Sequence, residues 1–208
     1  IRDDSGAGNH GIVVGGERAA GRFGQGLKLS GDRSCVTMPS ASTLLGPKSA
    51  EGTLALWVRP DYDPLQQSED TWSGWTVFLY AQRTSGNGLP DGYNEIGLSA
   101  HGKTLFGKVN TSGDYSSYPR VAVPLRQGVW THLALTWTPQ ERVLYVDGKP
   151  VARTKGNFEP TILDSCPVLV GKHPPTSRWN LKGTVDDVLV TPRALTAEQI
   201  AALSEGKL

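Results

Sequence analysis

Apolar and polar residues alternate most regularly over positions 130–153, in the segment WTHLALTWTPQERVLYVDGKPVAR. Leu133, Leu135 and Trp137 alternate with His132, Ala134 and Thr136, and we interpret 142–146 as a second strand of the same kind. A period of two with β-branched and aromatic residues is typical of half-buried strands. Asp147-Gly148 follows and favours a type I′ turn, in which both central residues have positive φ. The segment therefore predicts three consecutive antiparallel strands that need a second sheet to cover them.

Shorter runs of the same kind recur along the chain, separated by turns rich in glycine and proline. One helix is expected near the C-terminus, where Thr196 and Gln199 have the spacing of a capping box. The pattern predicts an all-β fold, a two-sheet antiparallel jelly-roll sandwich with a short C-terminal helix, as one domain over residues 1–208. The other predicted strands are 12–14, 21–29, 35–39, 53–59, 76–81, 93–99, 104–109, 121–125, 167–171 and 183–190.

Several motifs resemble those of one protein family. The strand WTHLA followed by LYVDGK resembles the central hairpin of laminin G-like domains in the concanavalin A-like lectin/glucanase superfamily. The segment GRFGQGLKL at 21–29 and the opening DDSGAGNHG at 3–11 are also similar to family motifs, as is the end of the chain. The resemblance implies the jelly-roll fold. It leaves the function open, because this fold hosts lectins, adhesion modules, glycoside hydrolases and polysaccharide lyases.

Composition narrows the class of protein. The 208 residues carry a formal net charge of only +1, so no bulk attraction to nucleic acid is expected. No apolar run approaches the roughly 20 residues of a membrane-spanning helix. The chain begins abruptly inside a motif, and we interpret it as a module of a longer secreted, periplasmic or cell-surface protein. Other domains of that parent chain are then expected partners.

Two cysteines, Cys35 and Cys166, allow two interpretations. They could form one disulfide between distant strands, as in a secreted protein, or remain buried thiols that behave as small hydrophobic side chains. Spatial geometry decides between these alternatives. The disulfide is our prediction.

Catalytic motifs of the superfamily are missing. Laminarinase-like hydrolases carry Glu-x-Asp-x-x-Glu on one strand, whereas Glu95 is the lone acid of its predicted strand. A lyase site could be assembled from His132, Tyr93 and Arg83, but His132 also matches the family's Trp-x-His strand and then has no catalytic role. We therefore predict a non-catalytic module and keep a lyase or hydrolase with an unrecognised site as an alternative.

Binding of a glycan or polysaccharide is the favoured function. Sugar sites combine exposed aromatic faces with nearby polar groups, and the long loops supply both. A protein-adhesion module is the other alternative. Trp57, Trp130 and Trp137 lie in strands and are expected in the core. The predicted carbohydrate-binding residues are Trp72, Trp75, Tyr93, Tyr115, Tyr118, Arg120, Arg178 and Trp179.

The family resemblance also implies a structural calcium ion between the N-terminal segment and the last strand. Asp3 or Asp4 and Asp186 are the implied ligands, with Asp32 as a weaker candidate. Calcium prefers six to eight oxygen ligands, which carboxylates and backbone carbonyls supply. We expect Asp186 to share the inward face of its strand with Val188 and Val190, where a carboxylate needs a partner.

Overall fold

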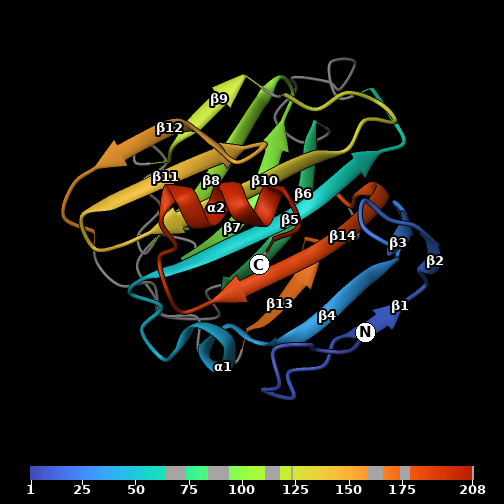
Figure 1. Cartoon of the computed structure of the whole chain (residues 1–208), viewed down its shortest axis with the longest axis horizontal. Helices are drawn as coiled ribbons and strands as arrows, with labels where there is room; N and C mark the ends of the chain where they lie inside the picture. Colours follow the sequence, from blue (N-terminus) through green and yellow to red (C-terminus); the bar gives the residue numbers. More distant parts are fainter. Residues whose placement is uncertain are drawn as a thin grey trace.

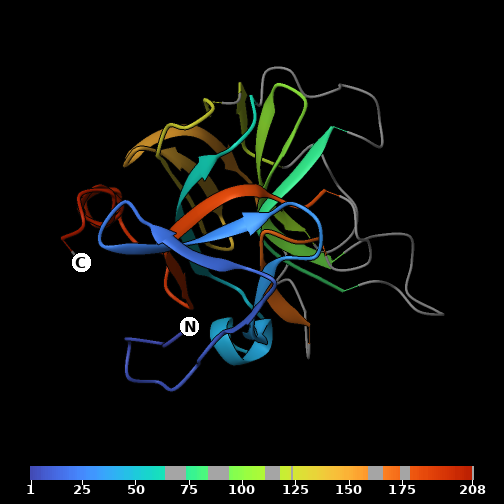
Figure 2. The same cartoon turned by 90° about the vertical axis from the view of Figure 1, so that its right-hand side faces the viewer.

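A computed structural model describes residues 1–63, 74–83, 94–110, 118–122, 124–158, 166–173 and 179–207. Within these residues the strands form two seven-stranded antiparallel sheets packed face to face, as Figures 1 and 2 show. The two-sheet sandwich predicted from the alternation pattern is confirmed. No helix in the described part of the chain is long and apolar enough to cross a membrane.

The first sheet, called sheet 1 below, includes two strands from the N-terminal part of the chain and the hairpins of its middle. It has the order β1-β4-β13-β6-β7-β8-β9. The bounds are β1 Ile12–Val14, β4 Cys35–Ser40, β13 Pro167–Val170, β6 Trp75–Arg83, β7 Asn94–His101, β8 Thr104–Asn110 and β9 Arg120–Ala122.

The second sheet, sheet 2, contains the predicted three-stranded segment and the last strand of the chain. Its order is β12-β11-β10-β5-β14-β3-β2. The bounds are β12 Lys149–Lys155, β11 Glu141–Val146, β10 Thr131–Trp137, β5 Gly52–Pro60, β14 Lys182–Thr191, β3 Gln25–Ser30 and β2 Glu17–Ala20. The turn between β11 and β12 has φ of 47° at Asp147 and 76° at Gly148, so the predicted positive-φ turn is present.

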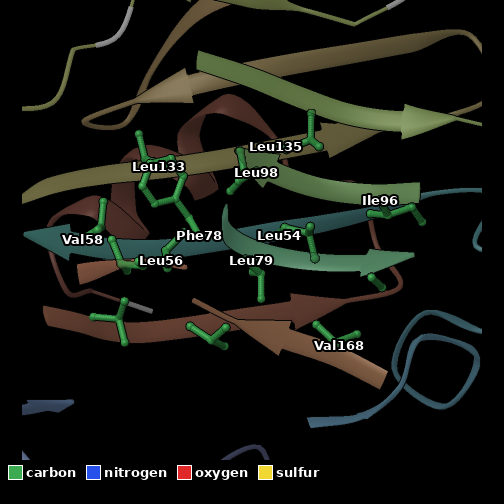
Figure 3. Close-up of a cluster of buried hydrophobic side chains, with 14 of the residues drawn as sticks. Leu54, Leu56, Val58, Phe78, Leu79, Ile96, Leu98, Leu133, Leu135 and Val168 are labelled. Carbon is green, nitrogen blue, oxygen red and sulfur yellow. The ribbon is translucent and has the colours of Figure 1, made fainter. Parts of the chain in front are cut away.

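The main core lies between the sheets and is built from one face of each strand (Figure 3). On sheet 2, β5 and β10 present every second residue to it, and β7 does so from sheet 1. In β6 a register shift brings the consecutive residues Phe78 and Leu79 into the core. Because strand side chains alternate between faces, the residues between these ones point outward on both sheets. The central core side chains are Leu54, Leu56, Val58, Phe78, Leu79, Ile96, Leu98, Leu133, Leu135 and Val168.

Two short helices complete the fold. Helix α1 (Ala41–Leu45) follows β4, and Ser40 caps it by accepting the Thr43 N–H. Helix α2 (Ala197–Ser204) begins with the predicted capping box, in which Thr196 and Gln199 bond each other's backbone N–H. It lies across the outer face of sheet 2 (Figure 1), where Ile200 packs on Ala55, Ala134, Val143 and Tyr145. This second apolar cluster covers only part of that face.

A β-bulge in β14 changes the direction of one predicted side chain. Asp186 pairs with Trp57 and Leu189 with Ala55, and the register shifts between them. Asp187 takes up the extra residue with a φ of 43°. Val188 and Val190 pack on the main core as expected. Asp186 instead lies on the outer face beside Trp57, so the expectation that it points inward is wrong.

The predicted disulfide is not formed, since Cys35 and Cys166 are not bonded to each other. They lie at opposite ends of the β4–β13 pair. Val36 is opposite Val170 at one end, and at the other the Ala41 N–H donates to the Cys166 carbonyl at 2.8 Å. Five or six residues of strand correspond to roughly 15–20 Å. A disulfide requires Cα atoms within about 7 Å, so the strand register opposes the bridge.

Candidate functional site

The outer face of sheet 1 carries a continuous group of polar and aromatic side chains. Opposed residues of neighbouring strands share a face of a sheet. Tyr80 is opposite Gly97 and Gln82 is opposite Glu95 across β6 and β7. Lys108 is opposite Gly97 across β7 and β8. Gly97 has no room for a side chain, because a Cβ there would lie 2.1 Å from the Tyr80 ring. The Tyr80 ring therefore occupies the space over Gly97 on this face.

Four half-buried rings form a cluster at one end of this face. Trp75 stacks on His101 with ring centroids 4.6 Å apart and planes inclined by 27°. The Trp75 ring also lies 5.7 Å from Phe106 and 6.1 Å from Trp179. We call these four residues the aromatic cluster. It presents a broad apolar surface that remains partly accessible to solvent.

Trp179 holds its place in the cluster with an unusual backbone conformation. Its φ is 66°, which is an outlier for a bulky residue. The Trp179 carbonyl accepts the Val77 N–H at 2.9 Å, and Val77 bridges the next residue, Asn180. These contacts with β6 fix the strained residue, a feature that is common at binding sites.

A buried ion pair lies beside the aromatic cluster. The Lys108 Nζ is 3.6 Å from the Glu95 Oε2, and the side chains are only 8% and 3% exposed. The Tyr118 hydroxyl donates a short hydrogen bond to the same carboxylate. The Lys108 Nζ also lies 4.2 Å from the centre of the Trp75 ring, in a cation–π arrangement. Burial lowers the pKa of Lys108, and the Glu95 carboxylate opposes this shift.

His173 connects the ion pair to the second tryptophan. Its ring packs edge-on against Trp179 at 4.5 Å and lies 5.4 Å from Tyr80. Burial, and secondly the positive charge of Lys108, lower the pKa of His173 to about 4. His173 is therefore neutral at physiological pH.

The structure brings together part of the predicted carbohydrate site. Trp75 and Trp179 are in contact in the aromatic cluster. Tyr118 is buried against Glu95, with its ring 5.9 Å from the Lys108 Nζ. Arg120 is exposed on β9, opposite Phe106 of the cluster. The predicted residues that lie outside the described part of the chain are Trp72, Tyr93, Tyr115 and Arg178.

Sequence reasoning missed three contributors to this site: His101, Phe106 and Lys108. The signal was present in the alternation, since Phe106 and Lys108 are separated by one residue and share a face of β8. The same alternation places Glu95 and Ser99 on the matching face of β7. Only the pairing of the two strands shows that Lys108 and Glu95 meet.

The four carboxylates assigned to calcium have other contacts. Asp186 accepts three backbone N–H groups, from Arg22, Phe23 and Asp187. Asp3 accepts the N–H groups of Ser5 and Asn9 within its own loop. No three His, Cys, Asp or Glu residues in the described segments gather as a metal site. The described residues do not fit a shared calcium site for Asp3, Asp4, Asp32 and Asp186, and the calcium ion stays an untested prediction.

Two buried histidines predict a pH-dependent stability. Burial also lowers the pKa of His132 to about 4, from an ordinary 6.5. Between these values the unfolded chain binds protons that the folded chain does not. The free energy of unfolding should be highest above pH 6.5 and fall as the pH drops toward 4. Each histidine contributes a slope of up to about 1.4 kcal/mol per pH unit.

Urea unfolding at several pH values measures this slope. His132→Asn should reduce the slope between pH 6.5 and 4, since one of the two protonation steps is removed. His10→Asn, at an exposed histidine, is the control for the loss of an imidazole outside the core. An unchanged slope in His132→Asn would contradict the assignment.

The comparisons with known proteins identify the family. Residues 30–201 match the laminin G model described as the concanavalin A-like lectin/glucanases superfamily. The chain belongs to this superfamily, as its opening and hairpin motifs suggested. No curated protein matches the chain.

Solved structures share the fold at low sequence identity. The binding domain of Paraclostridial Mosquitocidal Protein 1 superposes with a TM-score of 0.71 and 15% identity, over 99% of this chain and 49% of that one. The botulinum neurotoxin serotype G binding domain gives 0.72 and 14%, over 99% and 48%. This chain thus spans about half of each toxin domain.

Another solved structure has nearly the same length as this chain. It is domain 4 of AbnA, an extracellular arabinanase from Geobacillus stearothermophilus, in complex with arabinotriose. Its TM-score is 0.67 at 19% identity, and the alignment covers 97% of this chain and 91% of that one. At these identities the likeness establishes the fold.

Proposed function

We propose that this chain is a non-catalytic carbohydrate-binding module that holds a saccharide on the outer face of sheet 1. The observation that carries the proposal is the aromatic cluster of Trp75, His101, Phe106 and Trp179, which is half-exposed on that face. Aromatic faces bind the C–H surfaces of sugar rings, and neighbouring polar groups bind the hydroxyls. Arg120 is the exposed polar residue nearest in register.

The comparisons support this proposal. A domain of nearly the same extent was solved with a bound arabinotriose, and larger relatives are named as toxin binding domains. An accessory module of an extracellular polysaccharide-active or surface protein is the setting that fits these neighbours. A glycan is then the partner, together with other domains of the parent chain.

The ion pair favours binding over hydrolysis. Glycoside hydrolases use two carboxylates on either side of the scissile bond. Glu95 pairs with Lys108, a cation, and Glu95 is only 2% exposed. A carboxylate held in this way acts as a structural acceptor for Lys108 and Tyr118.

One arrangement favours a second candidate, a polysaccharide lyase. Tyr118 contacts Glu95 and lies near Lys108, and His173 lies on the same face. A tyrosine beside a cation could remove a proton while the cation neutralises a uronate. Tyr118 is only 3% exposed, so a substrate would have to displace its present neighbours.

Removing a ring of the aromatic cluster should weaken glycan binding. Trp179→Ala and Phe106→Ala should each lower the affinity about tenfold or more, because a stacking contact contributes on the order of 1–3 kcal/mol. Isothermal titration calorimetry against a panel of oligosaccharides measures the change. Phe158→Ala is the matched control, since that ring packs on Arg142 of sheet 2.

Each outcome decides between the candidates. Equal affinity in both cluster variants and the control would reject this face as the site. Unsaturated sugar products in the same samples would favour the lyase. Failure of the whole panel, together with capture of a protein partner, would favour an adhesion module.

A further inference from the structure

A pocket of about 670 Å³ opens on the other side of the molecule, beside the uncovered part of the outer face of sheet 2. Pockets of roughly 300–1,000 Å³ are the usual size for small ligands. We call it the Trp57 pocket. Its lining includes Arg22, Trp57, Trp130, Asp147, Ser204 and Glu205. The expectation that Trp130 lies in the core is wrong, since this residue is half-exposed just before β10.

Close contacts between chain segments fix one wall of the pocket. The Asp147-Gly148 turn lies against helix α2, and a Cβ on Gly148 would be 2.4 Å from the Ser204 Oγ. The Asp147 Oδ1 accepts the backbone N–H of His132 at 2.9 Å, which ties the turn to β10. The two carboxylates of the rim, Asp147 and Glu205, are therefore carried by packed segments.

Asp186 fixes the opposite wall. Its Oδ2 accepts the N–H groups of Arg22 at 2.7 Å and Phe23 at 3.0 Å. A Cβ on Gly21 would lie 2.3 Å from that oxygen, so only glycine permits this approach. The turn places the Arg22 guanidinium 4.9 Å from the Trp57 ring centre and the Phe23 ring edge-on to Trp57 at 6.1 Å. The pocket is thus pre-formed.

The floor contains an unsatisfied donor. Trp57 is 5% exposed, lines the pocket, and its Nε1 has no hydrogen-bond partner. The adjacent His132 ring, 5.3 Å away and 2% exposed, has an Nδ1 that also lacks a partner. A buried donor without an acceptor costs about 1–3 kcal/mol. The Trp57 Nε1 is closed to solvent, so a ligand acceptor reaches it only when the indole turns toward the pocket, and that bond then recovers part of the cost. The floor therefore favours a ligand with hydrogen-bonding oxygens.

The charges around the pocket balance. Arg22 lies over Trp57, and Arg59 lies over Trp130 at 5.1 Å from its ring centre. The rim carries the carboxylates of Asp147 and Glu205. Asp186 on the opposite wall is a third anion, and Lys207, whose Nζ pairs with the Glu205 Oε2, is a third cation. Three cations and three anions around one opening give no preference for a charged ligand. A neutral ligand with many hydroxyl groups can donate to the carboxylates and accept from the guanidinium and the indole.

We propose that the Trp57 pocket is a second saccharide-binding site, specific for a neutral sugar residue. The half-exposed Trp130 ring provides the apolar face. A sugar oxygen accepts the Trp57 Nε1–H, and a sugar hydroxyl donates to Asp147. The class of ligand, a saccharide, rests on the proposed function. The location of the second site does not rest on it, because the Trp57 pocket lies on sheet 2 and the aromatic cluster lies on sheet 1. Two sites on one module would raise the avidity for a polysaccharide with repeated units.

Nuclear magnetic resonance of the indole groups tests the proposal site by site. The chain has six tryptophans, so its indole Nε1–H region is simple, and Trp→Phe variants assign each resonance. Arabinotriose, xylotriose and cellotriose are the neutral probes, used up to about 50 mM to detect millimolar binding. Galacturonic acid trimer and glucosamine are the charged probes.

The Trp57 and Trp130 resonances should shift and saturate with a neutral probe. Trp130→Ala should weaken that binding about tenfold or more, and Arg22→Ala should weaken it less. Trp179→Ala, in the aromatic cluster on the outer face of sheet 1, should leave the Trp57 shift unchanged. A Trp57 resonance that no neutral probe moves would overturn the second site, and stronger binding of a charged probe would overturn its neutral specificity.

The two proposals fail separately. If the resonances of Trp57 and Trp130 shift and those of Trp75 and Trp179 do not, the aromatic cluster is rejected as a binding site and the Trp57 pocket is retained. The reverse pattern would reject the pocket alone. Trp130 is half-exposed, so its replacement leaves the fold intact and keeps the test decisive even if Trp57→Phe does not fold.

Discussion

Replacing Glu95 with alanine should lower the free energy of unfolding by about 3–5 kcal/mol. The substitution leaves the Lys108 ammonium without its ion-pair partner at a position that is 6% exposed. It also removes the acceptor of the Tyr118 hydroxyl. The variant loses more free energy than the attraction between the two charges, because the unpaired Lys108 ammonium stays buried and is not hydrated. Urea unfolding at pH 7 measures the change.

A double replacement provides the control. Glu95→Leu combined with Lys108→Met removes both charges and fills similar volumes, so most of the lost stability should return. If Glu95→Ala alone changes the free energy of unfolding by less than about 1 kcal/mol, the pair is hydrated in solution. The description of Glu95 and Lys108 as a buried ion pair would then be wrong.

Replacing Asp186 with alanine should cost about 3 kcal/mol of stability and disorganise the Trp57 pocket. Three backbone N–H groups lose a charged acceptor, and hydrogen bonds to charged groups contribute about 1.5–3 kcal/mol each. Water can replace part of this loss at the partly exposed turn. The turn that carries Arg22 and Phe23 should then move away from Trp57, which circular dichroism of the aromatic bands can detect.

Asp187 offers a matched control one residue away. Burial, and secondly the charge of Asp186, raise the pKa of Asp187, so its ionised form is disfavoured where it stands. Asp187→Asn removes that charge and keeps a residue type that tolerates the positive φ of 43°. Its stability should equal or exceed that of the parent protein. Equal losses in Asp186→Ala and Asp187→Asn would contradict the specific role of Asp186.

The arrangement of strands could be predicted because it follows from local patterns. The alternation over 130–137, the apolar segment 142–146 and the Asp147-Gly148 turn place three neighbouring strands in order. The capping box at Thr196 likewise depends on residues three positions apart. Two elements were not predicted, strand β2 and helix α1, because the short segments Glu17–Ala20 and Ala41–Leu45 carry little periodic signal.

The direction of Asp186 could not be predicted from alternation. The bulge at Asp187 inserts one residue into β14. Asp186, before the bulge, therefore points to the opposite face of sheet 2 from Val188 and Val190, which follow it. Bulges depend on a backbone conformation that aspartate allows but does not demand. The prediction of a disulfide was wrong for a related reason. The register of β4 and β13 separates Cys35 from Cys166, and the sequence alone does not give this register.

The site was predictable only as far as residue type allowed. Trp75 and Trp179 were identified because aromatic residues beside polar loops are typical of sugar sites. The contact of Lys108 with Glu95 depends on strand pairing, and the exposure of Trp130 depends on which part of sheet 2 helix α2 covers. Packing between residues far apart in the sequence determines both the Lys108–Glu95 contact and the exposure of Trp130. A local sequence pattern does not indicate such packing.

The most direct measurement of the central claim is a glycan array probed with the parent protein and with Trp179→Ala, both shown to be folded. We predict that the parent protein binds a defined set of glycans and that Trp179→Ala loses most of this signal. The Phe158→Ala control should retain it. Absence of binding by the parent protein to every glycan, or full retention of the signal by Trp179→Ala, would contradict the assignment of carbohydrate binding to this face.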